Sequence, residues 1–121
     1  MVRIKMNWYT QLIRLAILQK ATPDLFLGAE ENGRLVGVII ASTEVRKGWL
    51  NRIAVIPEER GKDIAKILTV SAEKALRKRG IKIIGLLIQK DNVVSIKLAK
   101  RMGYKEHPDI LYLAKRDSDD V

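Results

Sequence analysis

The N-terminal segment shows first a two-residue period and then a helical one. Residues 2–6 alternate apolar and basic side chains, which is the pattern of a short, half-exposed strand. Asn7 is a suitable N-cap, and the apolar residues after it fall on one side of a helix over 8–20. Thr22-Pro23-Asp24 ends that helix. The segment therefore predicts a strand followed by one amphipathic helix.

Three apolar runs follow, at 25–30, 34–42 and 49–56. Asn32-Gly33, between the first two runs, is a strong hairpin signal because both residue types accept the positive φ of a two-residue turn. Arg46-Lys47-Gly48 makes the next turn. We therefore expect the three runs to form an antiparallel meander.

The period changes to that of a helix after Pro57. Apolar residues between 64 and 76 recur at helical spacing, and Gly80 supplies a left-handed stop. The run 81–89 is apolar without alternation, which predicts a strand covered on both faces. A helix over 92–102 follows. The end of the chain predicts two short strands, 103–106 and 110–115.

The complete order of predicted elements is βαβββαβαββ. The strands 49–56 and 81–89 are connected through a helix, so they should lie parallel with a right-handed crossover. The expected fold class is α/β (α+β), a mixed, twisted sheet with helices on both faces and a shortened N-terminal region. The length of 121 residues fits a single domain over 1–121, with a frayed tail at 116–121.

Composition excludes several kinds of chemistry. Cysteine is absent, which removes disulfides, thiolate metal sites and cysteine nucleophiles, and His107 is the single histidine. No metal is therefore expected, nor a histidine-based triad. The sequence has no apolar run long enough to cross a bilayer and no signal-peptide pattern at its start, so a cytoplasmic protein without a membrane partner is expected.

Positive charge is concentrated in one part of the chain. The formal net charge is +9, yet residues 60–105 hold thirteen basic and three acidic residues, a net +10, and the rest is close to neutral. This asymmetry indicates an anionic ligand: nucleic acid, an acidic membrane or a phosphorylated cofactor. Solvated helix faces that keep the protein soluble are the alternative explanation.

The junction at 53–68 gives the anionic ligand a place. A strand ends before Pro57, and a basic turn containing Gly61 then opens a helix. The first N–H groups of a helix lack intrahelical partners and point outward with the positive end of the dipole, which suits a phosphate or pyrophosphate. Arg60, Lys62 and Lys66 add positive charge. A strand–turn–helix junction with Arg-Gly also occurs without a ligand.

The chain resembles the GNAT superfamily of acetyl-CoA-dependent N-acetyltransferases at this junction. The family pattern is Arg or Gln, two residues, Gly, one residue, then Gly or Ala. Residues 60–65 match it at Arg60 and Ala65 but carry Asp63 where glycine is expected. Further similar fragments, in the same order along about 25–115, are Lys78-Arg79-Gly80, the strand 81–89, Asn92-x-x-Ser95 and Met102-Gly103-Tyr104-Lys105. The pattern is most similar to the ribosomal-protein-alanine acetyltransferase branch.

The resemblance implies a binding site for acetyl-CoA. The strands 49–56 and 81–89 would separate at their C-terminal ends, with coenzyme A in the gap. Backbone groups of Ile53, Ala54 and Val55 would pair with the pantetheine arm, and Asn92 would bond the coenzyme from the next helix. Arg60 and the turn after it would hold the pyrophosphate through the amides of Gly61, Lys62, Asp63, Ile64, Ala65 and Lys66. Lys97, Lys100 and Arg101 are candidates for the 3′-phosphate nucleotide.

The resemblance does not supply a catalytic acid or base at the family positions. In the most similar branch the base lies five residues before the Asn and a Tyr acid lies seven after it, where this chain has Leu87 and Ala99. Tyr104 is a candidate general acid, or else a tyrosine at the edge of the core. Glu30 and Glu44 are strand-end carboxylates, and the general base stays unassigned.

Three functions remain open from the sequence. The first is transfer of an acetyl group to a primary amine, of a protein N-terminus, a lysine or a small molecule, by direct attack in a ternary complex. The second is a non-catalytic acyl-CoA-binding or interaction domain on the same fold. The third is a basic nucleic-acid-binding protein, which the absence of an aromatic-rich sheet face disfavours. The short N-terminal region predicts an open acceptor site, or one that a second subunit completes in a homodimer.

Overall fold

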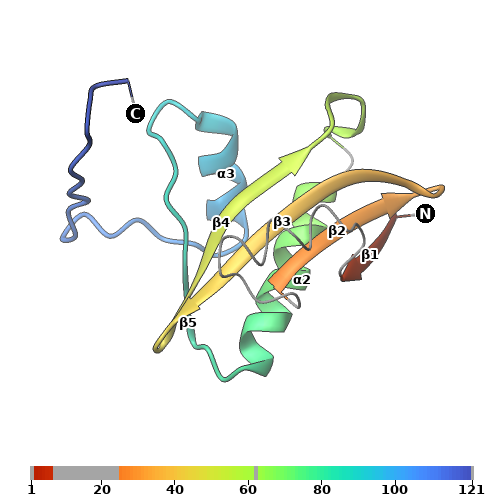
Figure 1. Cartoon of the computed structure of the whole chain (residues 1–121), viewed down its shortest axis with the longest axis horizontal. Coiled ribbons are helices and arrows are strands. Elements are labelled where there is room, and N and C mark those ends of the chain that lie inside the picture. The colour runs from red at the N-terminus through yellow and green to blue at the C-terminus, as the bar shows by residue number, and fades with distance from the viewer. Residues whose placement is uncertain (1, 7–24, 62, 121) are drawn as a thin grey trace.

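The computed structural model describes residues 2–6, 25–61 and 63–120. Five strands form one mixed sheet in the order β1-β2-β3-β4-β5, in which neighbours are antiparallel except for the parallel pair β4–β5 (Figure 1). The fold is α/β, as predicted, and the helix expected over 8–20 lies outside the described residues. The described elements are β1 (Val2–Met6), β2 (Phe26–Glu31), β3 (Arg34–Glu44), β4 (Lys47–Val55), η2 (Pro57–Glu59), α2 (Ile64–Lys78), β5 (Ile83–Gly85) and α3 (Val93–Arg101).

Two tight hairpins produce the predicted meander. Asn32 and Gly33 both have positive φ, 52° and 77°, and Glu31 pairs directly with Arg34. In the second hairpin Glu44 pairs with Lys47, so the turn consists of Val45 and Arg46 and lies one residue earlier than the sequence indicated. The first turn has residues suited to its backbone, and the second does not.

Val45 is strained because it is a β-branched residue at φ 52°, and its side chain is 94% exposed. We expect Val45→Asn to raise the free energy of unfolding by about 0.5–1 kcal/mol, since asparagine tolerates the left-handed region and no packing is lost. Urea unfolding measures the change. Thr43→Asn, an exposed position within β3, is the control and should give no gain; an equal gain there would show that the effect is not conformational.

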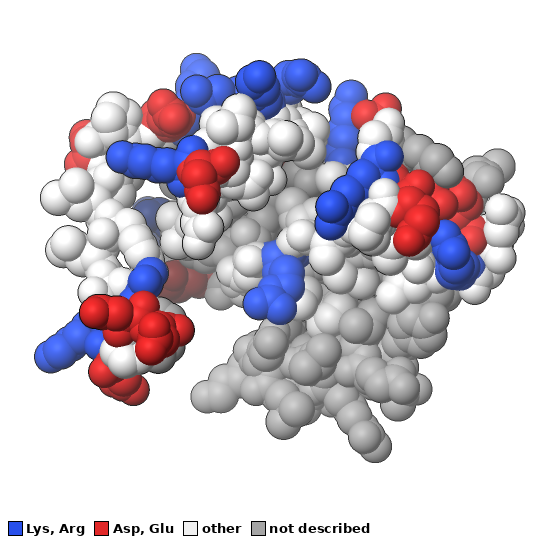
Figure 2. All heavy atoms as spheres, turned by 90° about the horizontal axis from the view of Figure 1, so that it is seen from above, with Lys and Arg blue, Asp and Glu red and all other residues white. Residues whose placement is uncertain are grey.

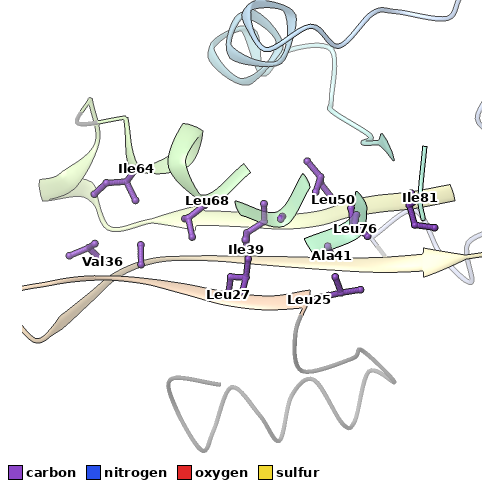
Figure 3. Packing of buried hydrophobic residues seen from close by; sticks show 12 residues of the cluster. Leu25, Leu27, Val36, Ile39, Ala41, Leu50, Ile64, Leu68, Leu76 and Ile81 are labelled. Atoms are coloured by element: carbon purple, nitrogen blue, oxygen red, sulfur yellow. The ribbon is translucent and has the colours of Figure 1, made fainter. Parts of the chain in front are cut away.

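The main core lies between α2 and one face of the sheet (Figure 3). Ile64, Leu68, Ala72 and Leu76 recur every four residues along α2 and are buried. Gly48 lets the helix approach β4, because a Cβ there would lie 2.9 Å from both Cδ atoms of Leu76. This close packing brings the C-terminal end of α2 against the start of β4. The sheet residues of the cluster are Leu25, Leu27, Ala29, Val36, Ile39, Ala41 and Leu50.

A β-bulge interrupts the centre of β4. Ile40 pairs with Arg52 and Ala41 pairs with Leu50, so Asn51 is an extra residue without an opposite partner on β3. The Asn51 side chain donates a hydrogen bond of 2.8 Å from Nδ2 to Ser42 Oγ. The bulge therefore divides β4 into a first half next to β5 and a second half that runs to the turn before α2.

The C-terminal part differs from three predictions. The strand expected over 81–89 is limited to β5, and it is not covered on both faces, because the side chains of Ile83 and Leu87 are 56% and 69% exposed. The strands expected at 103–106 and 110–115 are absent from the described chain, which has no regular structure after α3. α3 itself has no buried residue, so it does not provide the expected cover. An apolar run indicates that its side chains need to be buried, but it does not identify the segment that buries them.

The described helices include none that is long and apolar enough to cross a bilayer.

Candidate functional site

The parallel strands β4 and β5 separate soon after they meet. Their pairing covers only Lys47 to Trp49 on β4 and ends at Gly85, where the Trp49 ring lies against the glycine backbone. Beyond this point β4 continues to Val55 while the chain after β5 turns away (Figure 1). Within the described residues the second half of β4 pairs only with β3, and Arg52, Ile53 and Ala54 are exposed. The separation leaves a strand edge that an extended ligand can pair with.

The open edge leads to the N-terminus of α2. The first i→i−4 bond of this helix runs from Ile67 N to Asp63 O at 3.0 Å, so the N–H groups of Ile64, Ala65 and Lys66 precede the helical ladder. Gly61 has φ 87°, and a Cβ there would meet nothing within 4 Å, which leaves its backbone accessible. These N–H groups and the accessible glycine backbone lie where the sequence predicts an anion site, at the positive end of the helix dipole. Lys62 lies outside the described residues.

Asp63 occupies the N-cap position in the left-handed conformation, with φ 62° and ψ 18°. Its side chain makes no capping hydrogen bond. Glycine adopts this conformation without strain, whereas a residue with a Cβ atom is strained in it. The backbone therefore explains why the family pattern has glycine here. Asp63 also places a carboxylate at the helix N-terminus where the sequence predicts an anion to bind.

Three contacts hold the turn between β4 and α2 in place. Glu59 in η2 is buried. Its Oε1 accepts a hydrogen bond of 3.4 Å from Nη2 of Arg34 at the start of β3, and the two side chains form an ion pair. The Arg60 side chain donates from Nε to the carbonyl oxygen of Val55 at 3.4 Å, and Ile56 N donates to Val36 O at 2.9 Å. The turn is thus tied to both neighbouring strands, which fixes the position of the residues that lead into α2.

A pocket of about 290 Å³ lies between α2 and α3, next to the anion site. Lys66 and Arg101 contribute positive charge, and Asp63 and Glu73 contribute negative charge. Its other lining residues are apolar: Val70, Leu98 and Met102. Arg101 and Lys100 were both predicted as candidates for the 3′-phosphate nucleotide. Arg101 lines this pocket, whereas Lys100 lies 3.7 Å from Glu106 in an exposed ion pair. The apolar residues that line this pocket were not predicted, although the spacing of Lys66, Val70 and Glu73 places them on one face of the helix.

Asn92 caps α3, with Oδ1 accepting a 3.3 Å hydrogen bond from Ser95 N. The capping oxygen is occupied, and the Nδ2 donors are the part of the side chain left for a ligand. The Asn-x-x-Ser fragment therefore has a local structural role of its own.

The Tyr104 phenol points to α2, where its hydroxyl donates a 2.6 Å hydrogen bond to Glu73. Burial, first of all, and the neighbouring Glu73 carboxylate raise the pKa of this phenol well above its usual value. A proton held in this way is harder to release, which favours the packing interpretation of Tyr104 over the general-acid interpretation. The fixed backbone supports the same view, since Tyr104 N donates to Ala99 O.

The family positions for a base and an acid hold side chains without titratable groups. Leu87 is exposed beside the parted strands, and Ala99 lies half-buried within α3. The candidate carboxylates Glu30 and Glu44 lie on β2 and at the end of β3. No group of three or more His, Asp or Glu side chains that could hold a metal occurs in the described part of the chain.

Comparison with known proteins gives the family and the fold of the chain. A model of the acetyltransferase (GNAT) family matches residues 3–104. Among solved structures, AAC(6')-Iy in complex with a bisubstrate analogue, CoA-S-monomethyl-acetylneamine, has a TM-score of 0.75 at 17% identity, over 96% of this chain and 99% of that one. PaiA N-acetyltransferase from Thermoplasma acidophilum in complex with coenzyme A has a TM-score of 0.69 at 23% identity, over 87% and 90%.

A third similar structure is the ribosomal-protein-S18-alanine N-acetyltransferase from Escherichia coli, with a TM-score of 0.72 at 20% identity, over 88% of this chain and 79% of that one. The three likenesses establish a shared fold. The chain belongs to the GNAT acetyltransferase family. This is a family of acetyltransferases, which use acetyl-CoA as co-substrate.

Proposed function

We propose that this chain transfers the acetyl group of acetyl-CoA to a primary amine of a protein N-terminus, a lysine or a small molecule. The observation that carries the proposal is the open edge of β4 leading directly to the N-terminus of α2. An extended arm can pair with the edge while a pyrophosphate meets the helix amides. The likeness in fold to enzymes described with coenzyme A bound supports this arrangement.

Each part of the site has a role in this proposal. The backbone of Ile53, Ala54 and Val55 would hold the pantetheine arm, and the amides from Gly61 to Lys66 would hold the pyrophosphate. The pocket between α2 and α3 would take the nucleotide, with Lys66 and Arg101 near its phosphate and Val70, Leu98 and Met102 against its ring. Asn92 would donate to the coenzyme through Nδ2.

In this proposal the rate of acetyl transfer depends on how the two reactants are positioned. Acetyl-CoA supplies an activated thioester carbonyl. The chain would align an amine with this carbonyl and exclude other geometries. Such alignment lowers the activation free energy by several kcal/mol and requires no titratable group. Leu87 and Ala99 supply no proton transfer, so we propose an enzyme that takes its acceptor as the free amine.

Binding is tested by thermal unfolding with acetyl-CoA, coenzyme A and a short DNA duplex at physiological salt. Acetyl-CoA at a hundred times its dissociation constant should stabilise the protein by about 2.7 kcal/mol. DNA should give no comparable shift. A shift with DNA and none with millimolar acetyl-CoA would favour the nucleic-acid-binding function.

The pH dependence of turnover tests the absence of a base. Turnover on an amine acceptor should rise with pH in step with the free-amine fraction, about tenfold per pH unit below the amine pKa. General bases contribute about 10²–10⁴ in rate, so turnover should also be slow for the family. Steady-state rates between pH 6 and 9 measure this. The proposal would be contradicted if the turnover rate reached a plateau and fell only on an acidic limb. Loss of that limb in Glu30→Gln or Glu44→Gln would identify the base.

A non-catalytic acyl-CoA-binding domain is the second candidate function. The observation in its favour is Leu87, an exposed apolar side chain at the family position of the base. Tight acetyl-CoA binding without turnover on any of a panel of peptide N-termini, lysines and small amines would select it.

A further inference from the structure

The bulge in β4 turns two consecutive polar side chains, Asn51 and Arg52, to the face of the sheet opposite α2. Asn51 donates to Ser42 Oγ, and Arg52 lies directly opposite Ile40. On β3 these two partners alternate with the residues that pack against α2, so they belong to the other face. Consecutive residues of a regular strand point to opposite faces, and the extra residue lets both side chains share one. We call Ser42, Asn51 and Arg52 the bulge cluster.

The bulge cluster lies where the reactive end of an extended arm at the β4 edge would be. In the proposed function, on which this step rests, the pyrophosphate lies at the start of α2, beyond Val55. The arm would therefore run back along β4, with its thioester end toward the bulge. α2 packs against one face of the sheet, and the Trp49 ring closes the parting of the strands against the backbone of Gly85. An amine that approaches from the face opposite α2 would pass the bulge cluster.

The Arg52 guanidinium is free to bind an anion. Arg52 is exposed and makes no hydrogen bond or ion pair with any residue that the structure describes. The residues of β3 beside it on this face are Val38, Ile40 and Ser42, none of which is charged. Glu44, on the same face, lies four residues beyond Ile40 along β3, about 13 Å at the spacing of a strand. A guanidinium without a partner can bind a carboxylate through two parallel hydrogen bonds.

The hydrogen bond between Asn51 and Ser42 fixes a second recognition group beside Arg52. Asn51 Nδ2 donates to Ser42 Oγ at 2.8 Å, which leaves Oδ1 of Asn51 as an acceptor. The bulge cluster therefore presents a fixed acceptor for an N–H group next to a guanidinium for a carboxylate. The start of an acidic peptide offers both groups, because a backbone N–H and an acidic side chain can follow the terminal amine within one residue.

The charge of the whole molecule favours the same class of acceptor. The chain has a formal net charge of +9. Figure 2 shows Lys and Arg side chains spread across the face that it presents, whereas the acidic side chains gather in separate groups. A positive field attracts anionic molecules and repels cationic ones as they approach. The overall charge and the Arg52 guanidinium therefore act in the same direction.

We propose that Arg52 determines the acceptor of this chain and selects the N-terminal amine of acidic peptides, with Asp or Glu as the second residue. The Arg52 guanidinium binds the carboxylate of that residue, and Asn51 Oδ1 accepts its backbone N–H. The inference adds no chemical step to the proposed function and names the substrate class of the same site.

Turnover on three peptides that differ only at the second residue tests the selection. The value of kcat/KM should be about tenfold higher with glutamate than with glutamine, lower still with lysine, and the preference should shrink as salt is added. Arg52→Gln should remove the preference for glutamate, and Arg52→Glu should turn it toward lysine. Comparing variants on the same peptides cancels differences between the peptides in the pKa of the terminal amine.

Arg46→Gln is the matched control. Arg46 is also exposed and makes no hydrogen bond or ion pair with a described residue, but it lies in the turn between β3 and β4. This variant loses the same unit of charge and should keep the preference for glutamate. A preference that survives in Arg52→Gln, or that is lost equally in Arg46→Gln, overturns the proposal.

Calorimetry of the same peptides with the chain bound to coenzyme A gives a readout without turnover. The glutamate peptide should bind about tenfold more tightly than the glutamine peptide to the unmodified chain, and equally to Arg52→Gln. Equal binding and equal turnover of all three peptides by the unmodified chain overturn the role of Arg52 even where acetyl transfer proceeds. Selective binding that depends on Arg52, without transfer to any peptide, upholds that role and contradicts the proposed function instead.

Discussion

Replacing Asp63 by asparagine is expected to tighten acetyl-CoA binding about five- to thirtyfold. A carboxylate close to a pyrophosphate costs about 1 kcal/mol at 4 Å in water and more where solvent is reduced. Asparagine has the same size and also tolerates the left-handed backbone seen at φ 62°. The Asn variant thus removes the charge and keeps the backbone. Titration calorimetry against the unmodified chain gives the change in dissociation constant.

Asp63→Gly removes the charge and the backbone strain together. Its affinity should match that of Asp63→Asn, and its free energy of unfolding should rise by up to about 1 kcal/mol. At an ordinary helix start, replacing aspartate by glycine would be slightly destabilising, because it removes a favourable charge. The left-handed N-cap without a capping bond reverses that expectation.

The two variants give distinct results if the proposal is wrong. Weaker binding by both would mean that the Asp63 carboxylate orders Lys66 or Arg60 for the ligand. Unchanged binding by both would place the pyrophosphate away from the N-terminus of α2. Tighter binding by glycine alone would assign the effect to backbone adaptation.

Tyr104→Phe is expected to lower the free energy of unfolding by about 1–3 kcal/mol, because it removes a hydrogen bond to a half-buried carboxylate and leaves Glu73 without it. Tyr112→Phe is the matched control, since Tyr112 is 66% exposed, and should change little in the monomer. Denaturant unfolding of both variants at one low protein concentration measures this. Equal losses in the two variants would contradict a specific role for the Glu73 bond.

The same variant has a pH signature. The folded-state pKa of Tyr104 lies above that of the unfolded chain, so its stabilisation is complete below about pH 10 and is lost as pH rises through the folded value. The unfolding free energy of the unmodified protein should therefore fall more steeply above pH 10 than that of Tyr104→Phe, by at most about 1.4 kcal/mol per pH unit. Parallel profiles would mean that the phenol titrates normally.

Turnover distinguishes the two interpretations of Tyr104. If the residue only packs, Tyr104→Phe keeps its rate per folded molecule at a temperature well below its unfolding midpoint. A loss of a hundredfold or more in kcat, with KM for acetyl-CoA unchanged, would make it the general acid.

The sequence predicted the parts of the fold that local signals determine. Asn32-Gly33 defined the first hairpin, and the change of period after Pro57 located α2 and the anion site at its start. The hydrogen bond between Tyr104 and Glu73 joins residues 31 apart in sequence, and no local pattern encodes it. A strand was predicted over 110–115 from its apolar pattern, which indicates that the side chains need to be buried but not what buries them.

The bulge in β4 was not predicted, although the sequence carries a sign of it. Two consecutive polar residues, Asn51 and Arg52, separate Leu50 from Ile53 and interrupt the alternation, but in a strand of mixed polarity one such interruption does not identify an extra residue. The second hairpin was likewise displaced by one residue, because Val45 is an unfavourable residue for the conformation it adopts.

The extra residue at Asn51 shifts the phase of β4. Gly48 and Leu50 face α2 before the bulge, and Ile53 and Val55, which pair with Ile39 and Gly37, share that face after it. Even-numbered positions point to the helix in one half of the strand and odd-numbered positions in the other. Aligning this strand with a regular one therefore requires a gap of one residue at position 51. Deleting residue 51 would leave Arg52 directly after Leu50 and restore a regular strand, in which both halves keep the faces that they have now.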